Sequence, residues 1–171
     1  MDLMTKSAIN KHNSTRYILV CTLDDLRVAF AASSVERTIR MVEITPLPKS
    51  PQIVLGIINI HGMIIPVVNI RQRFRLPDIS PEFSDSIIIV NSDTRKLGIV
   101  VDSVQDVIEL DESRLVTPEN IISGVEYIDG VLKPEDGMVL IHNINKFLSL
   151  EEENALNESL IIPSPSGRGS G

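Results

Sequence analysis

An apolar run at residues 53–70, IVLGIINIHGMIIPVVNI, constrains the fold of this chain more than any other segment. Most of its apolar residues are β-branched, which favours strands over helices. The run divides at His61-Gly62, a pair that can close a two-residue hairpin because Gly tolerates positive φ. We therefore predict two antiparallel strands, Leu55–Ile60 and Met63–Ile70. Both faces of these strands are apolar, so we expect the hairpin to be buried, with structure packed on each side. The residues expected to hold the core together are Ile57, Ile58, Ile64, Ile65 and Val67.

The rest of the chain also indicates strands, because Ile and Val supply 40 of its 171 residues while aromatic residues are few. Strand-like segments bounded by turn residues are found at 16–23, 26–32, 38–44, 86–90, 97–102, 104–110, 125–132 and 138–142. A single helical turn is predicted at 35–37 and another at 143–148. Ser149 and Glu152 have capping-box spacing, which predicts a helix from about 150 to 160. About ten short strands indicate an all-β barrel or sandwich rather than βαβ units.

The length favours one domain, which could be divided into two lobes at the proline-containing loop 76–83. We expect a flexible tail at 1–14, a domain at 15–150, and a helix with a flexible tail at 151–171. Cys21 is the only cysteine, so it cannot form an intramolecular disulfide, and its apolar surroundings predict a small buried side chain.

The charge and hydropathy patterns bear on the partners and the compartment. The net charge of -7 argues against nucleic acid or an anionic membrane as the main partner. The N-terminal segment lacks the apolar stretch of a signal peptide, and no apolar run approaches the ~20 residues that span a bilayer. We therefore expect a cytoplasmic protein with no direct membrane insertion.

No catalytic or cofactor-binding pattern is found in the sequence. It contains no P-loop, no dinucleotide-binding glycine pattern, no nucleophile elbow and no H-E-x-x-H. His12, His61 and His142 do not have the spacing of metal ligands. The acidic segment 106–112 lacks the alternating oxygen ligands of a calcium loop. We therefore expect no enzymatic activity, no cofactor and no metal site.

Two surface features leave alternatives open. Arg71, Arg73 and Arg75 stand at period-two spacing around Phe74, which would place the three arginines on one side of a strand. Such a stripe on a small β-barrel could bind single-stranded nucleic acid, but a solvated edge that discourages strand addition is favoured.

Exposed apolar residues in constrained loops form the second feature. Ile121 and Ile122 lie between Pro118 and Gly124, and Leu47 lies among prolines. These residues could contact a protein partner or could plug the ends of the barrels.

Three segments together resemble the CheW family, the coupling proteins of bacterial and archaeal chemotaxis. They are VERTIRMVEITPLPKSPQIVLGIINIHGMIIPVVNIRQRFRLP (35–77), SIIIVNSDTRKLGIVVDSVQDV (86–107) and EYIDGVLKPEDGMVLIHNINKFL (126–148). The resemblance implies an all-β fold of two five-stranded, SH3-like β-barrel lobes packed around a shared hydrophobic core, with short helices. It also implies a non-enzymatic adaptor that couples the cytoplasmic tips of chemoreceptors to the regulatory domain of a CheA-type histidine kinase, at receptor clusters on the membrane.

Carried over position by position, the resemblance assigns residues to two partners. The receptor side comprises Val35, Asn59, His61 and Gly62. The kinase side comprises Val42, Ile44, Ile121 and Ile122.

The chain departs from the usual family pattern at His61, where Arg is typical, and at Asn69, where Asp is common. Imidazole differs from guanidinium in charge and in hydrogen-bond geometry, so His61 bears directly on receptor coupling. The sequence contains no receiver, phosphotransfer or ATPase segment, so we expect neither the two-domain CheV type nor the kinase itself. The alternatives are a CheW-like adaptor in another two-component pathway and, from a different class, a nucleic-acid-binding β-barrel.

Overall fold

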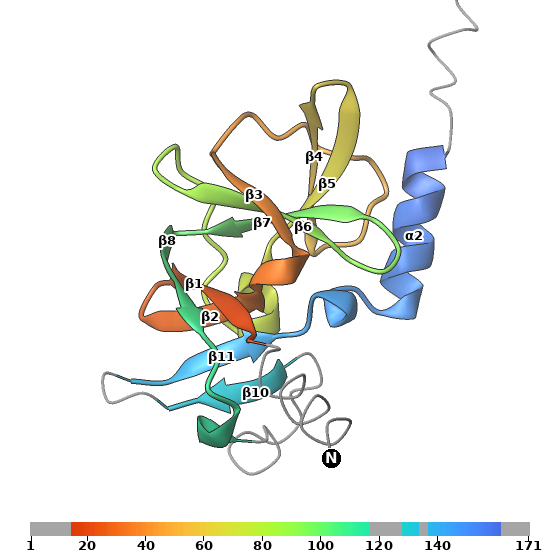
Figure 1. The fold of residues 1–171 in the computed structure, drawn as a ribbon. Coiled ribbons are helices and arrows are strands. Elements are labelled where there is room, and N and C mark those ends of the chain that lie inside the picture. Colours follow the sequence, from red (N-terminus) through yellow and green to blue (C-terminus); the bar gives the residue numbers. More distant parts are fainter. Residues whose placement is uncertain (1–14, 117–127, 134–136, 162–171) are drawn as a thin grey trace, which may run out of the picture.

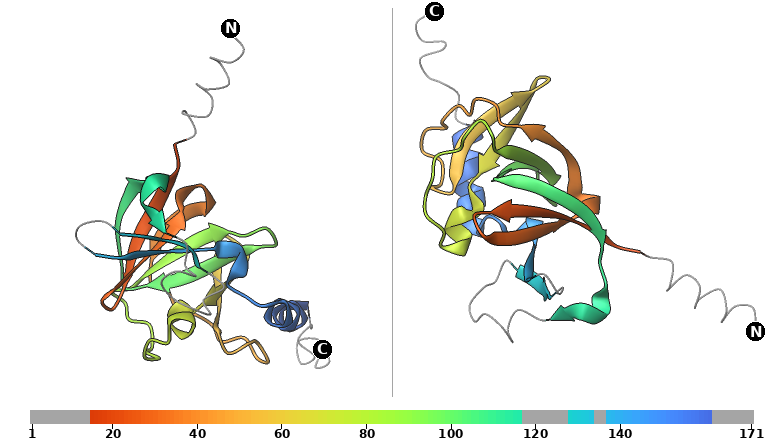
Figure 2. Two further views of the ribbon diagram at one scale, coloured as in Figure 1. Left: turned by 90° about the horizontal axis from the view of Figure 1, so that it is seen from below. Right: turned by 90° about the vertical axis from the view of Figure 1, so that its left-hand side faces the viewer.

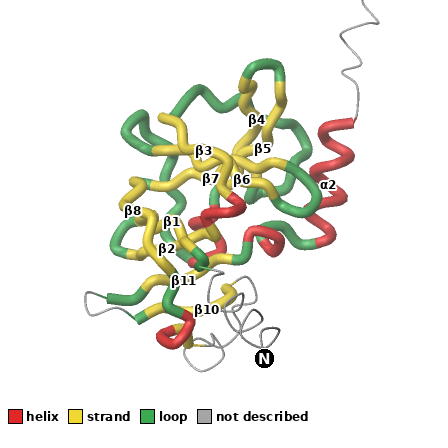
Figure 3. Tube along the Cα trace, viewed as in Figure 1, coloured by secondary structure: helices red, strands yellow, loops and turns green. Residues whose placement is uncertain are grey.

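The computed structural model describes residues 15–116, 128–133 and 137–161, and it places many more of them in strands than in helices (Figures 1 and 3). The strands are β1 (Tyr17–Leu23), β2 (Leu26–Ala31), β3 (Val35–Arg40), β4 (Val54–Ile60), β5 (Met63–Val68), β6 (Ser86–Asn91), β7 (Lys96–Val101), β8 (Ser103–Glu109), β9 (Leu115–Val116), β10 (Ile128–Leu132) and β11 (Val139–His142). The helices are the 3-10 turns η1 (Ala32–Ser34), η2 (Ile70–Phe74), η3 (Glu112–Arg114) and η5 (Ile144–Lys146), and the α-helix α2 (Leu150–Ile161).

The strands form two sheets, which we call sheet A and sheet B. Sheet A has the order β8-β1-β2-β11-β10-β9, and sheet B has the order β3-β6-β7-β5-β4. Neighbouring strands are antiparallel except for β2 with β11 and β5 with β7. Figure 1 shows sheet B above sheet A, with α2 along one side of sheet B, and Figure 2 shows the same arrangement from two other directions.

The all-β prediction is therefore confirmed, with two corrections. Among the described residues sheet A has six strands rather than five, because the short β9 pairs with β10. The helical turn expected at 35–37 is wrong. The helical turn is found instead at η1, just before Val35, and Val35 begins β3 by pairing with Val90 of β6. Val35 is β-branched, and pairing in a sheet suits it better than a helical turn.

The hairpin predicted at residues 53–70 is confirmed, including its two-residue turn. His61 and Gly62 have φ values of 51° and 85°, as a type I′ turn requires. The amide of Gly62 donates to Oδ1 of Asn59 at 2.8 Å, which further fixes the turn. Strand β5 ends at Val68, before the predicted Ile70, because Asn69 caps η2.

The expectation that the whole hairpin is buried is wrong at its tip. Ile58, Ile65 and Val67 are buried as predicted, whereas Ile64 is 48% exposed. Strand β5 pairs with β7 only through Val67 and Val68, and β4 is the outer strand of sheet B. The tip therefore projects beyond the neighbouring strands (Figure 1), and its apolar side chains face solvent.

The largest hydrophobic cluster is shared by the two sheets. Leu19 and Phe30 of sheet A pack in it with Ile88 and Ile99 of sheet B. Cys21 is fully buried in the same cluster, as predicted, and burial raises the pKa of its thiol to about 12. Each sheet also buries a smaller cluster of its own, around Val20 and Ile141 in sheet A and around Ile65 and Ile87 in sheet B, so the shared cluster joins two further cores.

The C-terminal helix is confirmed together with its capping box. The amide of Ser149 donates to Oε1 of Glu152 at 2.8 Å, and the amide of Glu152 donates to Oγ of Ser149 at 3.1 Å. Helix α2 inserts the buried side chain of Leu156 into the shared core. An ion pair between Arg95 and Glu153, at 3.2 Å, attaches the helix to the β6–β7 turn.

His142, at the end of β11, is a buried ionisable residue within this core. Its ring lies 4.1 Å from that of Phe147, 5.6 Å from that of Phe74 and 6.1 Å from that of Phe30, measured between centroids. The pKa of the imidazole is lowered from 6.5 to about 3, mainly by burial and to a smaller extent by the positive charge of Arg73, although a hydrogen bond to the carbonyl of Asn143 raises it in part. The imidazole is therefore neutral in the folded protein at neutral pH.

This burial predicts a loss of stability in weak acid. The folded pKa of His142 lies below its unfolded value, so its contribution is complete above about pH 6.5 and decreases as the pH falls toward 3. Between pH 6.5 and pH 5 we expect this residue alone to remove about 2 kcal/mol from the free energy of unfolding. Urea unfolding of wild type and His142→Leu at several pH values measures this directly. The stability difference between the two proteins should shift in favour of the variant by that amount, and a difference independent of pH would contradict the assignment.

Candidate protein-interaction surfaces

The tip of the β4–β5 hairpin borders an open hollow, which we call the tip hollow. It has a volume of about 430 Å³ and is lined by Glu36, Arg37, Ile60, His61, Met63, Ile65 and Lys96. Glu36 of β3 and Lys96 of β7 form an ion pair on its wall. A hydrogen bond from Lys96 lowers the pKa of the Glu36 carboxyl, and this effect outweighs the partial desolvation of the carboxyl group. The tip hollow thus combines apolar side chains with basic groups.

The four residues assigned to the receptor lie close to this hollow but do not play equal parts. Asn59, His61 and Gly62 lie together at the turn, where Asn59 is exposed and buttresses the backbone of Gly62. Val35 differs, because its half-buried side chain packs against the shared core, and its neighbour Glu36 reaches the hollow instead. Val35 therefore supports the surface rather than lining the hollow.

A second hollow, which we call the apolar hollow, lies between the segment after β3 and the outer strand β4. It has a volume of about 300 Å³ and is lined by Met41, Val42, Glu43, Ile44, Leu55, Pro81 and Phe83. Two hydrogen bonds between Thr45 and Ile57, of 2.9 and 2.8 Å, hold the segment against β4. A Cβ at Gly56 would lie 2.2 Å from the carbonyl oxygen of Thr45, so only glycine permits this approach.

Two of the four predicted kinase contacts lie in the apolar hollow. Val42 is 40% exposed, and Ile44 is partly buried against the cluster beneath it. Ile121 and Ile122 lie outside the described residues. Sequence reasoning missed Phe83, which is 90% exposed at the hollow's margin. A lone aromatic residue within a polar, proline-containing loop was the signal that could have found it.

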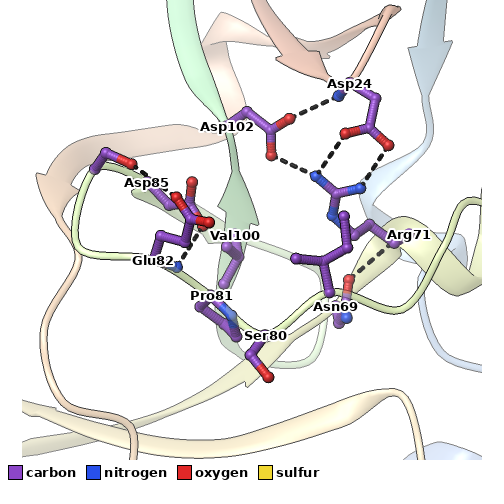
Figure 4. A pocket seen from close by; sticks show the side chains of 11 residues that line it. Asp24, Asn69, Arg71, Ser80, Pro81, Glu82, Asp85, Val100 and Asp102 are labelled. Carbon is purple, nitrogen blue, oxygen red and sulfur yellow. Dashed lines mark hydrogen bonds and ion pairs between the residues drawn. The ribbon is translucent and has the colours of Figure 1, made fainter.

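A third hollow, the acidic hollow, surrounds the guanidinium of Arg71 (Figure 4). Nη1 of Arg71 lies 2.9 Å from Oδ2 of Asp24, and Nη2 lies 2.6 Å from Oδ1 of Asp102. The second oxygen of Asp102 accepts the amide of Asp24 at 2.6 Å. Burial by itself lowers the pKa of Arg71, but the hydrogen bonds to the two carboxylates outweigh it, so the net shift is upward. The guanidinium therefore stays charged while only 9% of its side chain is exposed.

The predicted arginine stripe is wrong. Arg71 and Arg73 lie in η2, where three residues make a turn, so alternate residues do not share a face. Arg71 is buried, and Arg73 donates to the carbonyl of Phe147 at 2.7 and 3.0 Å and pairs with Glu152. Arg75 ends the helix in the left-handed conformation. The period-two interpretation failed because the side chain of Asn69 caps a helical turn where a strand was expected.

The asparagine at position 69 has a structural explanation in this hollow. Its Oδ1 accepts the amide of Arg71 at 3.0 Å, and its Nδ2 donates to Oδ1 of Asp78 at 3.3 Å. An aspartate could accept the first bond but would repel the carboxylate of Asp78. Asparagine therefore suits position 69 better than aspartate, because its amide group can donate to the carboxylate of Asp78.

Two further properties of the described ranges bear on function. Residues 15–116, 128–133 and 137–161 contain no group of three or more His, Cys, Asp or Glu placed to hold a metal ion. In the same part of the chain, no helix has the length and apolar character needed to cross a bilayer.

Comparison with known proteins gives a consistent result. The family described as CheW-like domain matches residues 17–152. The chemotaxis protein CheW of Treponema pallidum is 31% identical over 124 residues, which cover 69% of this chain and 73% of that protein. CheW of Klebsiella aerogenes is 27% identical over 152 residues, covering 88% and 92%. The crystal structure of the scaffolding protein TtCheW from Thermoanaerobacter tengcongensis superposes with a TM-score of 0.73 at 28% identity, covering 81% of this chain and 95% of that one.

The Arg71 network predicts a large effect of a single substitution. Arg71→Ala should lower the free energy of unfolding by about 2–3 kcal/mol, because it leaves two carboxylates facing each other. This is less than the ~3–5 kcal/mol of a fully buried pair, since Asp24 and Asp102 are 38% and 32% exposed.

Urea unfolding at neutral pH measures the Arg71 effect, and Arg16→Ala is the matched control. Arg16 forms an ion pair with Glu112 in which both side chains are more than 60% exposed, so its loss should cost about 0.5 kcal/mol or less. Equal effects of the two substitutions would show that the Arg71 network contributes no more than a surface pair.

Proposed function

Because this chain belongs to the CheW-like domain family, it is a non-enzymatic chemotaxis scaffold, and we propose that it joins a chemoreceptor to a CheA-type histidine kinase. The observation that carries the proposal is the pair of separate open hollows on sheet B, one at the hairpin tip and one at Val42. Two separate surfaces on one rigid sheet allow an adaptor to bind two partners at once.

The receptor side of the proposal uses the tip hollow. The type I′ turn holds His61 outward on a rigid hairpin, and Met63 presents an exposed apolar side chain in the same hollow. Arg37 adds positive charge to the same hollow, in which the charge of Lys96 is paired with that of Glu36. An apolar receptor tip with acidic or hydrogen-bonding groups fits this combination.

The kinase side uses the apolar hollow, with Val42 and Ile44 as contacts. This surface is apolar, partly exposed and fixed by the Thr45–Ile57 bridge, as a preformed docking surface requires. We include Ile121 and Ile122 in the kinase surface on the basis of the family resemblance alone. The proposed partner there is the regulatory domain of the kinase.

We further propose that residues 15–150 form two SH3-like barrel lobes, one built on each sheet. The path of the chain supports this proposal. In sheet A, consecutive strands β8 and β9 lie at opposite edges, so the chain passes from one edge to the other. In sheet B, the segment following the edge strand β3 pairs through Thr45 with Ile57 of the opposite edge strand β4. Both connections favour curled sheets.

The proposed location is the cytoplasm, at receptor clusters on the membrane. This follows from the proposed partners, because the receptor tip and the kinase must be reached together. A role in another two-component pathway has no observation in its favour, since the curated relatives described above are named as chemotaxis proteins. The nucleic-acid alternative loses its basis, because Arg71 and Arg73 are engaged inside the protein.

The role of His61 can be separated from the stability of its turn. His61→Asn suits a type I′ turn, so it should leave the free energy of unfolding unchanged or raise it by about 0.5 kcal/mol. The same substitution removes the imidazole and should weaken receptor binding, while His61→Arg should change receptor binding more than stability. Titration of the receptor tip against the three proteins, with thermal unfolding in parallel, makes the comparison. Equal receptor affinities would contradict a contact role for His61.

The kinase side predicts a different loss of function. Val42→Asp places a charge in the lining of the apolar hollow and should weaken binding of the kinase regulatory domain at least tenfold. Receptor binding should change little, because Val42 does not line the tip hollow. Calorimetric titration of the variant with each partner tests this. Reduced affinity for both partners, or for neither, would argue against the separation of the two surfaces.

A further inference from the structure

Phe83 is an aromatic side chain held in solvent by an ordered turn, which we call the Phe83 turn (residues 81–85). The amide of Glu82 donates to Oδ2 of Asp85 at 2.8 Å, and the amide of Asp85 donates to the carbonyl of Glu82 at 3.0 Å. The amide of Met41 donates to the carbonyl of Asp85 at 3.1 Å, which joins the turn to the segment after β3. Phe83 is therefore presented on a preorganised turn, although it is 90% exposed.

The surroundings of Phe83 extend this apolar surface. Pro81 and Phe83 line the apolar hollow together with Met41, Val42 and Leu55. A contiguous exposed apolar surface with an aromatic residue at its edge is typical of a protein-binding site. Packing in the hydrophobic core does not explain the position of Phe83, because almost none of its side chain is buried.

The other side of the same turn is acidic. Pro81 lines both hollows, and the acidic hollow is lined by four carboxylates, those of Asp24, Glu82, Asp85 and Asp102, and by one guanidinium, that of Arg71 (Figure 4). Arg71 is already paired with Asp24 and Asp102, which leaves the negative charge of Glu82 and Asp85 uncompensated by it. A concave site with an excess of carboxylates concentrates negative potential and attracts cationic groups.

We propose that the Phe83 turn is a second anchor of the kinase-side surface, which rests on the function proposed above. Phe83 enters an apolar depression on the regulatory domain, and a lysine or arginine next to that depression enters the acidic hollow. The pairing of an aromatic anchor with a complementary charge sets both the position and the register of the partner. An anionic membrane does not fit this surface, because the carboxylates beside Phe83 would be repelled by it.

The aromatic anchor is tested by Phe83→Ser, which removes the ring without disturbing the core. Titration of the regulatory domain of the CheA-type kinase encoded in the same genome should show an affinity loss of roughly 30-fold. Leu150→Ser is the matched control, because Leu150 is also a large apolar side chain, 77% exposed, but lies on α2. The control should bind as wild type does, and both variants should keep the wild-type melting temperature.

The charge element is tested by Glu82→Lys against Glu158→Lys. Both substitutions change the net charge equally, and the side chain of Glu158 is exposed on α2. Only Glu82→Lys should weaken kinase binding, and it should also reduce the dependence of affinity on sodium chloride. Equal weakening by both variants would mean that only overall charge matters, and the acidic part of the proposal would be overturned.

Comparison with Val42→Asp distinguishes failure of this inference from failure of the proposed function. If Val42→Asp weakens kinase binding and Phe83→Ser does not, the kinase surface stands and the second anchor is wrong. If neither does, the apolar hollow is not the kinase surface. If Phe83→Ser leaves kinase affinity unchanged and instead abolishes self-association in sedimentation experiments, the turn binds a second copy of this chain and the proposal is overturned.

Discussion

The buried guanidinium of Arg71 is the polar contact on which the relation between the two sheets depends. It binds Asp24 in the β1–β2 turn and Asp102 at the junction between β7 and β8. Arg71 itself follows β5, so one side chain connects sheet B, sheet A and the crossover between them (Figure 4). The shared core supplies the apolar area, but apolar packing has little directionality. A bidentate ion pair has a defined geometry, so it can fix how the sheets meet.

The same network shapes the surface that we propose for the kinase. Arg71 holds the carboxylates of Asp24 and Asp102 in fixed positions, and both carboxylates line the acidic hollow. The hairpin tip and the apolar hollow depend similarly on local constraints, the positive φ of His61 and the close approach at Gly56. Rigid contact surfaces suit an adaptor, because a scaffold that transmits control between two partners must not absorb their motion internally.

Several features could be predicted because each depends on neighbouring residues. The His61-Gly62 turn follows from glycine at the second turn position, and the Ser149 capping box follows from a three-residue spacing. The shift of β3 toward Val35 and the exposure of Ile64 could not be predicted in this way. Both depend on which strands stand beside them, and β7 accompanies β5 only as far as the hairpin's base.

The sequence by itself determined the strands, the hairpin turn, the burial of Cys21 and the resemblance to the CheW family, because local propensity and residue order carry that information. Only the tertiary structure decided the roles of the arginines and of Phe83. Arg71 is a buried ion-pair partner because Asp24 and Asp102, distant in the chain, converge on it. Phe83 lines the apolar hollow, and the Asp85 carbonyl joins its turn to Met41 of the same hollow. Long-range convergence of this kind has no period or spacing in the sequence, so it could be found only in three dimensions.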